Sequence, residues 1–178
     1  DVQNARSQTV LDADVISALP ATRAYGALLN AIPGVTVDNN GLAMTPTMTF
    51  FSSHGGPSNE GKVTINGMGV GAASGGGGVG TLIYDTSNAE EMSVLVAGGL
   101  GESDTGGPVV NLVPRSGGNT FSGQSFYNTA GKWSSGSNVN DFLRDIGIRE
   151  AGGVISAYDG SVSLGGPIMR DRIWFFGG

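Results

Sequence analysis

His54 is the only histidine in the chain, and acid–base catalysis and metal binding both favour imidazole. No Gly-x-Ser-x-Gly nucleophile elbow accompanies it. A metal site needs several ligands at workable spacing, and one histidine with scattered carboxylates does not supply them. The residues that follow it, Gly55-Gly56-Pro57, are typical of an exposed turn. We interpret His54 as a turn residue, and we expect no catalytic residue and no metal ligand in this sequence.

Two glycine patterns imitate nucleotide-binding motifs. The first resembles a dinucleotide fingerprint and comprises Gly67, Gly69 and Ala72, with Asp85 downstream. The helix that such a motif requires is not expected, because residues 74–80 are nearly all glycine. The second, Gly61-Lys62, lacks the earlier glycine of a phosphate loop and is followed by Val63. We therefore expect no cofactor.

The charged residues are few and dispersed. The net charge is −6, and the nine Lys and Arg residues form no basic stripe that could neutralise phosphates, so nucleic-acid binding is not expected. The acidic pairs Glu90-Glu91 and Glu102/Asp104 are interpreted as solvated faces. The absence of cysteine excludes disulfides and thiolate chemistry.

Glycine dominates the composition. The 178 residues include 32 Gly, and only 13% are charged, against roughly 25% in soluble domains. Turns, bulges and close backbone contacts use glycine, so this composition favours a β-rich extracellular or outer-membrane protein over a cytosolic enzyme. The longest strongly apolar run, residues 94–97, is far shorter than the ~20 residues of a spanning helix. Membrane association would therefore depend on barrel strands.

The first two thirds of the chain predict a small mixed sheet with a helix. The helix is expected over residues 21–31 and is stopped by Pro33 and Gly34. Leu28, Leu29 and Ile32 are expected to be buried against Val94, Val96, Val109 or Val110. Strands are expected at residues 35–37, 45–51, 63–66, 91–97 and 109–113, with a turn at 39–41 and a loop at 69–80.

The residue pattern of the sequence changes after Pro114, where a turn at 116–119 precedes a segment with aromatic residues. We place a domain boundary near Gly118, between domains 1–117 and 118–178. Residues 158–164 alternate strictly between two sets of side chains, which predicts a strand with an apolar and a polar face. The apolar set is Tyr158, Val162 and Leu164, and the polar set is Asp159, Ser161 and Ser163. Further strands are expected at 120–128 and 172–176, and one helical turn at 141–148. The fold class is α+β, mainly β.

Four segments resemble, in the right order, the TonB-dependent outer-membrane receptors. They are residues 19–35, which include Pro33-Gly34-Val35, and residues 62–67, 89–123 and 163–177. The first three resemble the plug domain and its passage into the first barrel strand. The fourth resembles early barrel strands of the large receptors that carry an N-terminal carboxypeptidase-regulatory-like domain. Where the family usually has Arg-Gly, this chain has His54-Gly55.

The resemblance implies that residues 1–117 form a plug that occludes a barrel, and that residues 118–178 begin this barrel. Substrate would bind from outside, and movement of a plug segment would open the passage. The implied partners are the remainder of the barrel and the TonB energy-coupling system, and the implied location is the bacterial outer membrane. No enzyme activity and no substrate-binding residue is implied.

A second hypothesis comes from the edges of these strands. Receptors of this kind close barrels of about 22 strands, whereas this chain ends after three candidate strands. Unpaired strand edges need a partner. The remainder of a receptor would provide one, and so would identical copies in a self-assembling extracellular filament or sheet. The sequence leaves both open.

Overall fold

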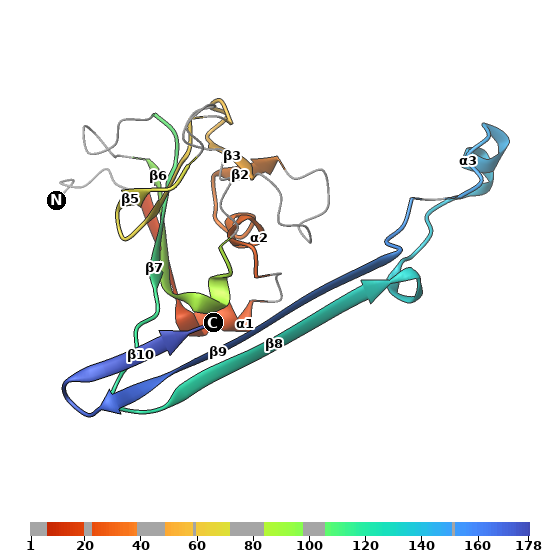
Figure 1. Ribbon diagram of the computed structural model, residues 1–178. Coiled ribbons are helices and arrows are strands. Elements are labelled where there is room, and N and C mark those ends of the chain that lie inside the picture. The colour runs from red at the N-terminus through yellow and green to blue at the C-terminus, as the bar shows by residue number, and fades with distance from the viewer. Residues whose placement is uncertain are drawn as a thin grey trace.

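The computed structural model describes residues 7–19, 23–38, 49–58, 60–71, 84–97, 106–150 and 152–178. Its centre is a five-stranded sheet (Figure 1). In spatial order its strands are β1 (Ser7–Asp12), β6 (Ala89–Ala97), β7 (Val109–Pro114), β4 (Lys62–Ile65) and β5 (Met68–Gly69). Strand β4 runs parallel to β7, and the other neighbours are antiparallel.

Strand β6 contributes alternate residues to the hydrophobic core. Met92 and Val94 are fully buried, while Ser93 between them and Leu95 after them are half-buried. β-Branched and aliphatic side chains at period two suit this half-covered pleated surface. The strands predicted at 63–66, 91–97 and 109–113 are confirmed within one or two residues as β4, β6 and β7.

Two short helices cover this sheet. Helix α1 (Ala13–Ala18) is capped by Asp12, whose Oδ1 accepts a hydrogen bond of 2.8 Å from the Val15 amide. Helix α2 (Tyr25–Leu29) places Leu28 and Leu29 in the core. The expected core is confirmed, since the buried cluster contains Leu28, Leu29, Ile32, Val94, Val96 and Val110.

The helix expected over residues 21–31 is too long. It begins only at Tyr25, because Ala24 is extended and forms an isolated antiparallel bridge with Asp85. It ends at Leu29, before the stop residues Pro33 and Gly34, and Gly34 has a φ of 82°. Residues 20–22 lie outside the described ranges.

Some other elements before β6 lie where the sequence predicts them. Strand β2 (Val35–Asp38) pairs with β3 (Phe50–Ser53), and the beginning of the strand expected at 45–51 lies outside the described residues, as do the turn at 39–41 and most of the loop at 69–80. Asn66 and Gly67, with φ of 50° and 80°, make the turn between β4 and β5. Gly69, where the loop was expected to begin, is instead the last residue of strand β5.

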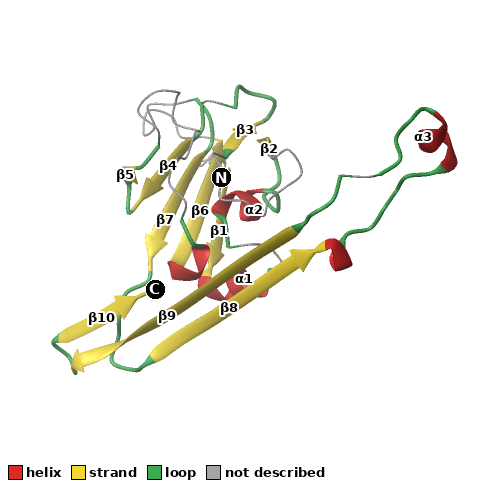
Figure 2. Ribbon diagram, turned by 45° about the vertical axis from the view of Figure 1, so that its right-hand side comes forward, coloured by secondary structure: helices red, strands yellow, loops and turns green. Residues whose placement is uncertain are grey.

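The second part is a three-stranded antiparallel sheet in the order β10-β9-β8. Its strands are β8 (Ser122–Gly131), β9 (Ser156–Met169) and β10 (Ile173–Gly177). Strands β8 and β9 form a long hairpin that passes beside α1 and extends well beyond the central sheet (Figures 1 and 2). The loop at its tip contains the one-turn helix α3 (Asp141–Asp145) and the 3-10 turn η2 (Lys132–Ser134). The three expected strands and the helical turn are confirmed.

No helix among the described residues is long and apolar enough to cross a membrane.

Candidate functional site

The five-stranded sheet and the three-stranded sheet meet at a small polar contact around η1 (Thr86–Asn88), the 3-10 turn that precedes β6. Asp85 caps this turn by accepting hydrogen bonds from the Ser87 amide at 2.8 Å and from the Ser87 hydroxyl at 2.6 Å. The Ser87 Oγ also lies 3.1 Å from the Oγ of Ser161 on β9. This serine pair joins the central sheet directly to the hairpin.

Arg23 makes the second link between the sheets. Its side chain is only 8% exposed, and its guanidinium carbon lies 4.2 Å from the centroid of the Phe126 ring on β8. Its Nη1 donates a hydrogen bond of 3.1 Å to the carbonyl oxygen of Ile16 in α1. Its own carbonyl accepts hydrogen bonds from the amide and hydroxyl of Thr86, at 2.8 and 3.0 Å. One residue therefore contacts α1, η1 and β8.

The connection from β7 to β8 is fixed at both of its ends. The Arg115 amide donates to the carbonyl of Asn88 at 2.8 Å, and its Nε donates to the carbonyl of Ala89 at 3.1 Å. Further along, the Asn119 side chain donates to Asp171 Oδ1 at 2.6 Å and accepts from the Asp171 amide at 2.9 Å. Its Oδ1 also accepts from Trp174 Nε1 at 2.7 Å. Asn119 thus ties the connection to the β9–β10 turn.

The hairpin has two chemically different faces, as the alternation in residues 158–164 predicts. Asp159 and Ser161 are half-buried and Ser163 is buried, on the face toward η1. The opposite face is open, with Tyr158 81% and Val162 70% exposed. Exposed large apolar residues on or next to the three strands are Phe121, Tyr127, Ile155, Tyr158, Val162, Leu164, Ile168, Met169, Ile173 and Trp174.

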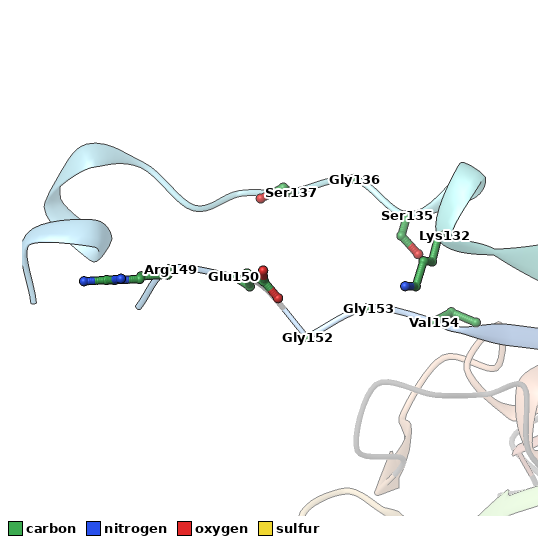
Figure 3. A pocket seen from close by; sticks show the side chains of 9 residues that line it. All are labelled: Lys132, Ser135, Gly136, Ser137, Arg149, Glu150, Gly152, Gly153 and Val154. Atoms are coloured by element: carbon green, nitrogen blue, oxygen red, sulfur yellow. The ribbon is translucent and has the colours of Figure 1, made fainter. Parts of the chain in front are cut away.

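The loop at the hairpin tip encloses an open pocket of about 470 Å³ between its two arms (Figure 3). Its charged lining residues are Lys132, Arg149 and Glu150, and Lys132 points into the space between the arms. Every lining residue except Val154 is exposed, so water fills this pocket and screens its charged side chains.

The residues that the sequence singled out do not converge on one site. His54 is exposed at a turn with φ of 51°, as interpreted. Glu90 is exposed and Glu91 is half-buried, so the interpretation of this pair as a solvated face holds fully only for Glu90, while residues 102 and 104 lie outside the described ranges. Asp85 caps η1, which is a structural role. Within the described ranges, no three His, Cys, Asp or Glu residues gather as metal ligands would.

Sequence reasoning missed Arg23 and Asn119. One signal for Arg23 is visible in the sequence, because it is the only Lys or Arg between positions 7 and 61 and is followed by Ala24 and Tyr25. Asn119 gives no such signal, because Gly-rich turns commonly contain Asn. Only the pairing of β10 with β9 brings its two partner residues, Asp171 and Trp174, near to it.

Residues 1–108 match the TonB-dependent receptor plug domain. A match over more than half of the chain places this protein in the TonB-dependent receptor family, a family of outer-membrane transporters. Among relatives, a TonB-dependent transporter named Oar from Myxococcus xanthus is 30% identical over 167 residues, which are 89% of this chain and 14% of Oar.

Solved receptors share the fold. The siderophore receptor PirA from Acinetobacter baumannii superposes with a TM-score of 0.65 at 16% identity, over 95% of this chain and 23% of that receptor. The unliganded ferric citrate transporter FecA gives 0.62 at 20% identity, over 93% and 24%. This chain therefore spans less than a quarter of the length of these relatives.

These findings confirm the resemblance, the fold class and the location in the outer membrane. The matched region is the plug domain of a TonB-dependent transporter. None of the relatives reported above supports the alternative of a self-assembling filament.

Proposed function

We propose that residues 1–117 are the plug that gates substrate uptake, and that residues 118–178 are the first strands of the barrel around it. The matching plug domain carries this proposal. The protein acts as a transporter and not as an enzyme. Its partners are the remaining barrel strands and TonB, which supplies the energy for uptake.

The two faces of the hairpin support its role as barrel wall. In an outer-membrane barrel, apolar residues point to lipid and polar residues point inward, alternating along each strand. Here the polar face of β9 packs on the plug, and the face with Tyr158 and Val162 is open. In the sheet order β10-β9-β8, strands β8 and β10 each keep one free edge, which pairs with neighbouring barrel strands.

The contacts of the connection support a boundary near Gly118. Arg115 is still held by the plug, through the carbonyls of Asn88 and Ala89. Gly117 already lies against the backbone of Phe175 in β10, so closely that a side chain there would clash. Gly118 has no such neighbour. The chain thus passes from plug to wall within three residues.

Uptake is tested in the full-length transporter, in a host from which the native gene has been deleted. Ferric siderophores, which the solved relatives bind, are the first substrates to try. Separately, the full sequence is expected to contain an N-terminal carboxypeptidase-regulatory-like domain. Uptake should depend on both the receptor and TonB. Removal of residues 7–114 should leave an open barrel that leaks without TonB. Equal uptake with and without TonB in the intact receptor would refute the proposal.

A further inference from the structure

Arg23 is an unusual residue for its position. It is 8% exposed, and among the residues that the structure describes no carboxylate forms an ion pair with it. A buried cation is costly unless nearby groups replace the water it loses. Its surroundings must therefore supply that compensation.

Two groups supply part of it, and they belong to different parts of the molecule, while the buried Nε has no hydrogen-bond partner among the described residues. The carbonyl of Ile16 in α1 accepts from Nη1, and the ring of Phe126 on β8 covers the guanidinium carbon at 4.2 Å. A planar guanidinium stacks on an aromatic face, and this attraction is strongest when the pair is desolvated. The cation is thus most favourable when plug and hairpin are in contact.

The main chain of Arg23 makes the contact rigid. Its carbonyl receives both hydrogen bonds of Thr86, which is 1% exposed and begins η1. The next residue of η1, Ser87, contacts Ser161 on β9. The guanidinium and the serine pair therefore hold adjacent strands of the same hairpin.

We infer that Arg23 is a positioning residue that fastens the plug to the first barrel strand through the Phe126 ring. Without this pair, the hairpin separates from η1 while the plug keeps its fold. The terms plug and barrel rest on the proposed function, whereas the contact itself can be measured without any transport assay.

The serine pair provides the measurement. The chain has no cysteine, so Ser87→Cys with Ser161→Cys introduces the only two thiols, at positions whose Oγ atoms are 3.1 Å apart. The rate of disulfide formation in the detergent-solubilised chain under a mild oxidant reports how often η1 and β9 are in contact. In this background, Arg23→Ala and Phe126→Leu should each slow the reaction about tenfold. Both together should slow it no further, because each removes the same contact.

Tyr127→Ala is the matched control. Tyr127 is the next residue on β8, 72% exposed on the opposite face, and its replacement should leave the rate unchanged. Arg23→Lys keeps the charge but loses the planar group, so it should give an intermediate rate. If Arg23→Ala fails to fold by circular dichroism, Phe126→Leu and Arg23→Lys decide the result. Unchanged rates in both, equal slowing by Tyr127→Ala, or multiplicative effects in the double variant would overturn the inference. A failed uptake assay would count against the proposed function alone.

Discussion

At the scale of single residues, Leu28 shows how lean the core is. It is 1% exposed within a cluster of fourteen buried apolar residues in the described part of the chain. Truncation of a buried leucine removes its transfer free energy and leaves a cavity. Leu28→Ala should therefore lower the free energy of unfolding by about 2–5 kcal/mol. Urea unfolding of the chain measures this, with Val10→Ala, at a 50% exposed position, as the control that should change little.

Tyr25 makes stability depend on pH in alkaline solution. Burial raises the pKa of its phenol above 10.0, and the Thr49 side chain partly opposes this. The folded state therefore binds the phenolic proton more tightly than the unfolded state does. The resulting stability is complete below about pH 10 and is lost as the pH rises through the folded-state pKa.

Tyr25→Phe should make the alkaline loss of stability shallower, because phenylalanine has no proton to lose. Some slope should remain, since burial and then Asp85 also raise the pKa of Tyr84. The free energy of unfolding is measured from pH 9 upward for the original chain and for Tyr25→Phe, and the two slopes are compared. Identical slopes would show that Tyr25 does not contribute.

At the scale of elements, the β9–β10 turn depends on a residue outside it. Asp171 has a φ of 61°, and the Asn119 side chain holds it through two hydrogen bonds while accepting a third from Trp174. Asn119→Ala should loosen the turn by about 1 kcal/mol, since each exposed hydrogen bond contributes modestly. Hydrogen exchange over residues 165–177 should become faster.

The control for this change is Asn138→Ala, at an exposed position in the loop between β8 and β9. It should leave exchange over residues 165–177 unchanged. If Asn119→Ala leaves it unchanged as well, backbone pairing alone holds the turn, and the hydrogen bonds of Asn119 are incidental.

At the scale of the whole molecule, the two faces of the hairpin should respond differently to charge. Val162 is 70% exposed on the outward face, which faces lipid in the proposed barrel. In the full-length transporter, Val162→Arg should cost about 2–4 kcal/mol near the midplane of the bilayer. Asn128→Arg, on the inward half-buried face of β8, should cost much less. Refolding titrations into lipid vesicles compare the two, and equal costs would contradict a membrane wall.

Local patterns in the sequence were sufficient for much of this architecture. Alternation in residues 158–164 and β-branched runs at 91–97 and 109–113 reflect the period of a strand, so strand identity and the two faces of β9 follow from neighbouring residues. The stop at Pro33 and Gly34 likewise acts through local backbone sterics. The order of four family-like segments was enough to identify the plug, which the match over residues 1–108 confirms.

Contacts between distant segments were decided only by the tertiary structure. Strand β1 exists because it pairs with β6, about eighty residues later, and α2 is short because Ala24 bridges to Asp85. Arg23 gained its role from Phe126, more than a hundred residues away, and Asn119 from Asp171 and Trp174. Local periodicity carries no information about such partners, since each is brought near only by the folding of both sheets. The sequence by itself thus determined the class of protein and most of its strands, and the tertiary structure decided β1 and which residues join the proposed plug to its wall.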